Sequence, residues 1–175
     1  MMDYRYYDEL AKVVEFVDGK PYWTEDRSSK IKSGDLAGTK TANHRYRYIG
    51  ISLDGIYKTK AAHRLNFYMC HGYLPEMIDH ADRDTDNNRI ENLRPCTRSE
   101  NMLNCKKRAG CSSSYRGVSI IRRANGVVRW LCESYATGSK VSLGTHDTEI
   151  EAAVAYNEYI ISNINSRFVE LNVIG

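Results

Sequence analysis

Four polar residues in the middle of the chain have types and spacing suited to phosphodiester hydrolysis. Asp79 and His80 are adjacent, Asn92 follows twelve residues after His80, and Asn101 nine residues after that. Histidine is the side chain best placed to accept a proton from water near neutral pH, provided that a second group, here Asn92 or a backbone carbonyl, fixes its tautomer. Asp79 and Asn101 offer the oxygen ligands that suit a hard cation, which can neutralise charge developing on a phosphate.

The local pattern around these residues predicts strand, loop, strand and helix in that order. A short apolar run ends at His80, a loop rich in Asp and Asn follows, and residues 89–94 form a second strand-like run that carries Asn92. Thr97 and Glu100 have the spacing of a capping box, which begins a helix carrying Asn101. We therefore expect the four polar side chains to be directed at one point.

Three other interpretations of this region compete with this one. Asp82, Asp84 and Asp86 alternate as in a calcium loop, but Asn87 and Leu93 stand where that loop needs Gly and Glu. The five cysteines include no C-x-x-C pair, which argues against a zinc site. A plain polar turn between two strands remains an alternative.

The stretch 75–104 resembles the HNH nuclease motif, in the H-N-N variant of phage and intron-encoded enzymes. The wider frame matches too, in the His63-Arg64-Leu65 run and in residues 87–93. The resemblance implies a ββα-metal (His-Me finger) module in which His80 is the general base and Asn92 bridges the loop and orients the ring. It also implies that Asp79 and Asn101 hold one divalent cation, Mg²⁺ or another such as Mn²⁺. His63 could contact a phosphate or a group near the metal, or could be purely structural.

Before this stretch, the pattern predicts a helix that runs into a strand over residues 6–17. It also predicts two hairpins that turn at Asp-Gly pairs, at residues 18–19 and 54–55. Residues 61–71 read as a helix closed by Gly72, with Leu65, Tyr68 and Met69 on its buried side.

The tail 115–175 has a pattern of its own, with three strands followed by a helix. Asn125-Gly126 is a turn signal, and Thr148 with Glu151 forms a second capping box. Residues 115–118 (Y-R-G-V), 130–133 (W-L-C-E) and 142–157 resemble the apetala/ethylene-response-factor DNA-binding domain, which also occurs fused to phage HNH nucleases. That resemblance implies a small three-stranded antiparallel sheet plus a helix, with the sheet in the major groove.

Three residues of the tail depart from the pattern of the plant domains, namely Ser119, Ile121 and Ser142. The DNA sequence that the plant domains recognise therefore does not carry over to this chain. By strand parity, Trp130 and Cys132 should face the helix, and Arg129 should face outward.

Charge is unevenly distributed along the chain, although the net charge is only +3. Basic residues concentrate around the predicted nuclease helix and along the tail, which suggests a phosphate-binding face, with a merely solvated surface as the alternative. The candidate DNA contacts are Arg64, Arg98, Lys106, Lys107, Arg116, Arg122, Arg123, Arg129 and Lys140.

Together these observations predict an α+β protein with a nuclease domain over 1–108 (ββα-metal core about 75–108), a linker at 109–114 and a DNA-binding domain over 115–175. We expect a metal-dependent HNH endonuclease of homing type, from a phage or mobile element, that acts on double-stranded DNA as a monomer. The chain shows no signal core or apolar run of membrane-spanning length, so we expect a cytoplasmic protein with no membrane partner. The alternatives are a DNA-binding regulator whose nuclease site is inactive, and a nuclease that acts on RNA or branched DNA.

Overall fold

The computed structural model describes residues 4–105, 110–164 and 168–175, which form two compact units, Met1–Cys96 and Thr97–Gly175. The division falls before the helix that carries Asn101, whereas the sequence suggested a boundary at 109–114, and the predicted domain limits stay a prediction. Lys106 and Lys107 lie outside the described residues.

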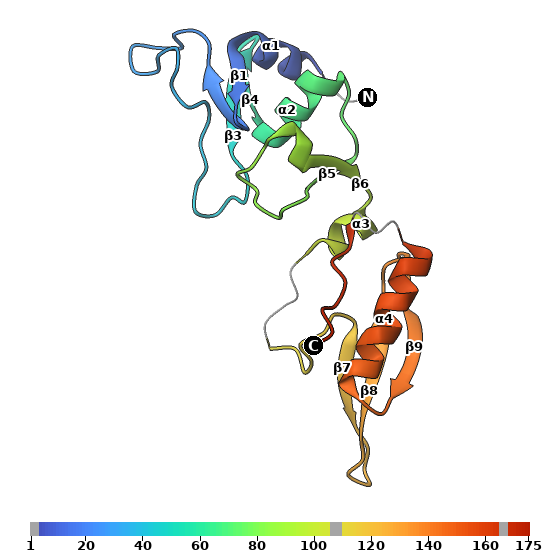
Figure 1. Cartoon of the computed structure of the whole chain (residues 1–175). Helices are drawn as coiled ribbons and strands as arrows, with labels where there is room; N and C mark the ends of the chain where they lie inside the picture. Colours follow the sequence, from blue (N-terminus) through green and yellow to red (C-terminus); the bar gives the residue numbers. More distant parts are fainter. Residues whose placement is uncertain (1–3, 106–109, 165–167) are drawn as a thin grey trace. The chain divides into compact units, whose positions relative to one another are not determined.

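The first unit combines two helices with three antiparallel hairpins (Figure 1). Its elements are α1 (Arg5–Val13), β1 (Val14–Val17), β2 (Lys20–Trp23), β3 (Tyr48–Leu53), β4 (Ile56–Ala61), α2 (Ala62–His71), β5 (Met77–His80), the 3-10 turn η1 (Ile90–Asn92) and β6 (Leu93–Cys96). The predicted helix-to-strand passage, both early hairpins and α2 are confirmed. The run that carries Asn92 is not a single strand, because η1 precedes β6 and Asn92 closes that turn.

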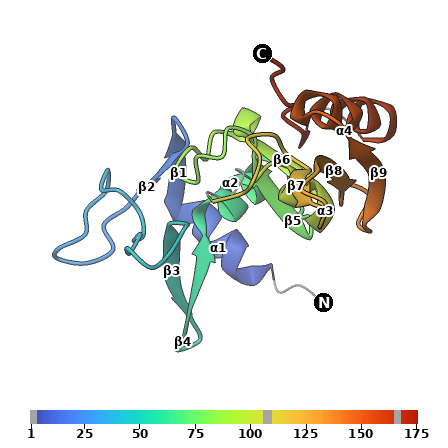
Figure 2. The same cartoon turned by 90° about the horizontal axis from the view of Figure 1, so that it is seen from below.

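Both early hairpins turn on Asp-Gly pairs with positive φ, at Asp18-Gly19 (52° and 76°) and Asp54-Gly55 (52° and 76°). Such a turn matches the twist of the strands that it joins. Figure 2 shows the β3–β4 hairpin continuing directly into α2. The chain therefore passes from this hairpin into α2 without an intervening loop.

The core of the first unit lies where α1 and α2 meet the hairpins, and it includes Leu10, Ile49, Leu65 and Phe67. The α2 helix ends at Gly72, whose φ of 74° is the left-handed conformation that closes a helix with little strain for glycine. The prediction for the buried side of α2 is right for Leu65, which is fully buried. It is wrong for Met69, which is exposed.

The second unit holds the short helix α3 (Arg98–Leu103), the strands β7 (Val118–Arg122), β8 (Val128–Ser134) and β9 (Val141–His146), and the helix α4 (Glu149–Asn163). The strands form an antiparallel sheet in the order β7-β8-β9, and α4 covers one face of it (Figure 1). Both helices begin with the capping boxes predicted at Thr97 and Thr148. No helix among the described residues has the length and apolar character needed to cross a membrane.

Small side chains let α4 lie close to the sheet. Ala152 and Ala153 are fully buried in the cluster that contains Cys132, and Trp130 packs against it. This agrees with the prediction that Trp130 and Cys132 face the helix, since alternate residues of a strand point to the same face.

The C-terminal segment is fastened back onto the second unit by asparagines. The Asn172 side chain accepts from the Arg116 backbone N–H at 2.7 Å and donates to the Arg116 carbonyl at 3.1 Å. The Asn157 side chain of α4 in turn bonds the backbone N–H and carbonyl of Asn172, each at 2.8 Å. These four bonds tie together the segment just before β7, the helix α4 and the C-terminal segment.

We predict that Gly117→Ala destabilises the second unit much more than Gly126→Ala does. Both glycines have positive φ, 76° and 79°, so each substitution carries a backbone cost of about 1–2 kcal/mol. Only at Gly117 would the added Cβ collide with neighbours, 2.2 Å from the Tyr156 ring and 2.7 Å from the Glu133 carbonyl, whereas nothing lies within 4 Å at Gly126. We expect an extra loss of about 2 kcal/mol or more at Gly117.

Urea unfolding followed by Trp130 fluorescence, in a Trp23→Phe background, measures this difference. Equal losses for the two variants would contradict the predicted contact between Gly117 and Tyr156.

Candidate active site

The Asp79-His80 pair lies at the end of β5, in a hairpin whose two strands fix where both side chains point. Asp79 pairs with Arg94 and His80 with Leu93 across the β5–β6 ladder. Both members of the pair are buried, at 6% and 4% exposure. Buried polar side chains require hydrogen-bond partners, so their neighbours define the site.

Arg94 neutralises Asp79 from the facing strand. Its Nε and one terminal nitrogen lie 2.9 and 2.7 Å from the same carboxylate oxygen, Oδ2. Directly opposed residues of antiparallel strands are close neighbours, which explains this cross-strand pair. The predicted metal ligand therefore already carries a partly buried ion pair.

Asn88, and not Asn92, hydrogen-bonds the His80 ring. His80 Nε2 lies 3.0 Å from Asn88 Oδ1, and Asn88 is 3% exposed. The Asn92 side chain instead accepts from the Asp82 N–H at 3.0 Å and donates to Asp82 Oδ1 at 2.9 Å and to the Asn87 carbonyl at 2.8 Å. Asn92 thus bridges the loop as expected, but these bonds give it no direct part in orienting the ring.

The acidic residues of the 81–89 loop hold its turns. Asp82 Oδ1 accepts from the Asp84 N–H at 2.8 Å, and Asp84 Oδ1 accepts from the Asp86 N–H at 3.0 Å. These are Asx turns, which explain the Asp alternation by backbone geometry. Slight burial opposes ionisation of Asp82, but hydrogen bonds from Asn87, the Asp84 amide and Asn92 outweigh it and lower the pKa of this carboxyl.

Three rings cluster around the candidate base. The His63 and His80 ring centroids are 5.2 Å apart in an edge-on arrangement, and the Tyr46 ring lies 4.5 Å from His63 and 5.9 Å from His80. His63 is 6% exposed, and its Nδ1 is buried without a hydrogen-bond partner among the described residues. Burial, together with the charges of His80 and Arg64, lowers the pKa of His63 to about 3. The His63 imidazole is therefore neutral near neutral pH.

Carboxylate and amide oxygens, as on Asp79 and Asn101, suit a hard divalent cation. Within the described part of the chain, no three His, Cys, Asp or Glu side chains cluster in a way that could hold a metal, so a cation here would depend on amide, phosphate or water oxygens as well. Asn101 lies on α3 in the second unit, and its pairing with Asp79 stays a prediction.

Several candidate DNA contacts have structural partners. Arg64 donates to the Glu76 and Pro75 carbonyls at 3.2 and 3.1 Å, and Arg116 donates to the Leu103 and Cys105 carbonyls at 2.6 and 2.5 Å. Arg129 pairs with Asp147 and with the Thr145 carbonyl, and Lys140 pairs with Glu133 at 2.7 Å. The exposed candidates whose side chains form no bond with another described residue are Arg98, Arg122 and Arg123.

Asn88 and Tyr46 are neighbours of His80 that the sequence pattern did not identify. Asn88 falls in the 87–93 frame, but three asparagines in six residues cannot be ranked by spacing while the loop conformation is unknown. Tyr46 lies far from the motif in sequence and carried no local signal.

The low pKa of His63 predicts a loss of stability in acid. The unfolded chain protonates this imidazole below its ordinary pKa of 6.5, whereas the folded protein does so only near 3. The contribution is therefore fully present above about pH 6.5 and is lost as pH falls towards 3, by up to about 1.4 kcal/mol per pH unit.

We expect His63→Phe to lose less unfolding free energy than wild type between pH 7 and pH 4, as measured by urea titration. His44→Phe, at an exposed position, is the matched control. A His63→Phe protein that is as acid-sensitive as wild type would refute the assignment.

Comparison with known proteins bears directly on this site. The model of the HNH endonuclease family matches residues 60–103, a span that contains Asp79, His80, Asn92 and Asn101. No curated protein and no solved structure matches the chain. The matched segment supports a nuclease of the HNH type.

Proposed function

We propose that this protein is a metal-dependent HNH endonuclease that hydrolyses DNA phosphodiesters, with His80 as the general base. The observation that carries the proposal is a buried Asp79-His80 pair within the segment that matches the HNH family. Burial in a polar, hydrogen-bonded cluster suits a base whose geometry must be fixed before substrate arrives.

In the proposed reaction His80 accepts a proton from water as the water oxygen attacks phosphorus. The bond from phosphorus to the 3′ oxygen breaks, and protonation of that oxygen leaves 3′-hydroxyl and 5′-phosphate ends. Asp79 and Asn101 would hold a divalent cation, Mg²⁺ or Mn²⁺, which supplies charge stabilisation at the phosphate. Asn92 keeps the loop closed, so that the residues around the base keep their places.

The second unit is proposed to bind double-stranded DNA. Its three-stranded sheet backed by one helix has the architecture that the apetala-type resemblance implies, and it carries several of the candidate basic residues. A homing role in a phage or mobile element, action as a monomer and a cytoplasmic site belong to the same proposal.

One observation favours the alternative of a DNA-binding regulator with an inactive nuclease site. Arg94 donates from Nε and from one terminal nitrogen to Oδ2 of the predicted metal ligand, so Arg94 competes with a cation for that atom. The cleavage test below separates these functions.

We expect the full-length protein to nick or cut plasmid DNA with Mg²⁺, and His80→Ala to lose at least about 100-fold in rate, because general-base catalysis contributes on that scale. DNA affinity should stay within a few-fold, since phosphate contacts dominate affinity. His71→Ala, at an exposed position, is the control. Full cleavage by His80→Ala would refute the assigned base, and absence of cleavage by wild type with any divalent cation would favour the regulator.

We expect Arg122→Ala combined with Arg123→Ala to weaken DNA binding and to reduce the dependence of log K on log salt by about two units, because each phosphate contact contributes about one. Both residues are exposed near the β7–β8 turn. Binding isotherms at several salt concentrations measure this slope.

Arg5→Ala with Lys12→Ala, on exposed positions of α1, removes the same charge from the first unit and is the control. An unchanged slope in the Arg122/Arg123 variant would remove these residues from the DNA face.

A further inference from the structure

The orientation of the Asn88 amide determines which His80 nitrogen carries the proton. Asn88 Nδ2 lies 3.4 Å from the Asp86 carbonyl, which can only accept, so the amide nitrogen is on that side and Oδ1 faces the ring. An amide oxygen also can only accept, so His80 Nε2 must be the donor across the 3.0 Å contact. In a neutral imidazole with its proton on Nε2, the lone pair is on Nδ1.

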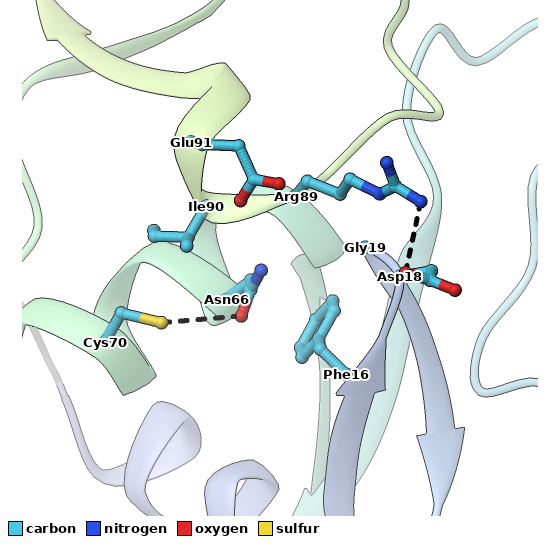
Figure 3. Close-up of a pocket in the computed structure, with 8 residues that line it drawn as sticks. All are labelled: Phe16, Asp18, Gly19, Asn66, Cys70, Arg89, Ile90 and Glu91. Atoms are coloured by element: carbon cyan, nitrogen blue, oxygen red, sulfur yellow. Dashed lines mark hydrogen bonds and ion pairs between the residues drawn. The ribbon is translucent and has the colours of Figure 1, made fainter.

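Asn88 is held by α2 from behind. The Asn66 side chain, itself buried, donates from Nδ2 to the Asn88 carbonyl at 2.7 Å, and its Oδ1 faces Cys70 Sγ at 3.8 Å. Figure 3 shows the Asn66 side chain rising from α2, with Cys70 on one side and the Arg89–Glu91 segment on the other. A buried hydrogen bond between two asparagines is costly to break without replacement.

The β1–β2 turn holds the same point from a second direction. A Cβ at Gly19 would lie 2.4 Å from the Arg89 backbone nitrogen and 2.9 Å from the Asn88 carbonyl carbon, so the two backbones are in close contact there. Arg89 also reaches Asp18 of this turn at 3.1 Å, as Figure 3 shows. Asn88 thus sits between a helix and a hairpin turn, and neither belongs to the β5–β6 hairpin.

We propose that Asn88 is a positioning residue that, held by Asn66 and by the Gly19 turn, keeps the His80 proton on Nε2 and makes Nδ1 the atom that accepts a proton from water. The proposal rests on the proposed function for its catalytic consequence. When Nδ1 takes the proton, Nε2–H still donates to Asn88 Oδ1, so the same contact stabilises the imidazolium. The Asn92 bridge then shapes the loop, while Asn88 determines the chemistry of the ring.

The ring nitrogens can be observed directly by ¹⁵N NMR of histidine-labelled full-length protein, at a pH where the ring is neutral, with His80 signals assigned by their loss in His80→Ala. We expect wild type to show a protonated Nε2 and an unprotonated Nδ1. Asn88→Ala should give a mixture of the two tautomers. Asn88→Asp, which keeps an acceptor oxygen, should retain the wild-type pattern. Glu91→Ala, at an exposed position of η1, should also leave it unchanged.

Catalysis gives the second readout. Asn88→Ala should lower kcat by about 10- to 100-fold, the range seen when a residue that orients a catalytic histidine is removed, with KM within about two-fold. Asn66→Ala should fall between it and wild type, and Glu91→Ala should match wild type. Thermal unfolding identifies any variant that fails to fold. If Asn88→Ala fails to fold, the tautomer of wild type and the tautomer and kcat of Asn66→Ala test the proposal instead.

The possible failures are distinguishable. A proton on Nδ1 in wild type, or a tautomer unaffected by Asn88→Ala, overturns the role of Asn88 whatever the enzyme does. Full activity of His80→Ala overturns the proposed base, while the NMR result still decides whether Asn88 sets the tautomer. A loss of kcat in Asn88→Ala together with a tautomer shift supports both.

Discussion

The first unit depends on one constraint, that a buried imidazole and a buried carboxylate at the end of a four-residue strand must have all their partners in place. The facing strand β6 supplies a partner for the carboxylate, and the loop between the strands supplies one for the imidazole. Arg94 reaches Asp79 from the facing strand, and Asn88 reaches His80 from the loop. Unpaired polar groups in such a place would each cost about 1–3 kcal/mol.

This requirement explains why the 81–89 loop is so rich in Asp and Asn. Its side chains form the hydrogen bonds that a sheet or helix would otherwise provide, with Asp82 accepting from Asn92 and Asn87 and from the Asp84 backbone. Thr85 and Lys40 add links between the loop and the 40–45 segment, through the Arg45 carbonyl and Asp86. The loop can therefore be irregular and still hold Asn88 in a single position.

Local elements were predictable because their signals are local. The Asp-Gly turns, the two capping boxes and the Gly72 helix end each depend on a few consecutive residues, and all appear in the structure. The candidate site was predictable in its members Asp79 and His80, which are adjacent in sequence and buried together. The spacing of residues in the sequence could not identify the hydrogen-bond partners of Asp79 and His80. Asn92 and Asn88 are chemically identical, and only the path of the loop decides which one reaches the ring.

The same reasoning explains why a count of basic residues does not by itself identify a DNA-binding face. Arg64 and Arg116 are used to hold backbone carbonyls, and Arg129 and Lys140 are paired with acids, so a count of basic residues mixes structural and available cations. Arginine forms such bonds readily, because its planar group presents five donors in a fixed arrangement. Arg122 and Arg123 differ because their exposed position next to a turn leaves no acceptor within reach among the described residues.

The Arg94–Asp79 pair explains how so small a hairpin can carry a buried carboxylate, the predicted ligand of a cation. A carboxylate with 6% exposure needs a positive neighbour even when no cation is bound, because an isolated buried charge is strongly destabilising. Arg94 supplies that neighbour and donates to Oδ2 from Nε and from one terminal nitrogen, which helps to hold the carboxylate in one orientation. The hairpin can therefore fold with Asp79 in place without a cation, and a cation at the proposed site would have to share Asp79 with Arg94 or displace it from Oδ2. Removing Arg94 would therefore act first on the folding of the hairpin, and on the proposed metal site only through that loss of folding. Removing Asn88 would leave the Arg94–Asp79 ion pair intact and would act on His80, the proposed base.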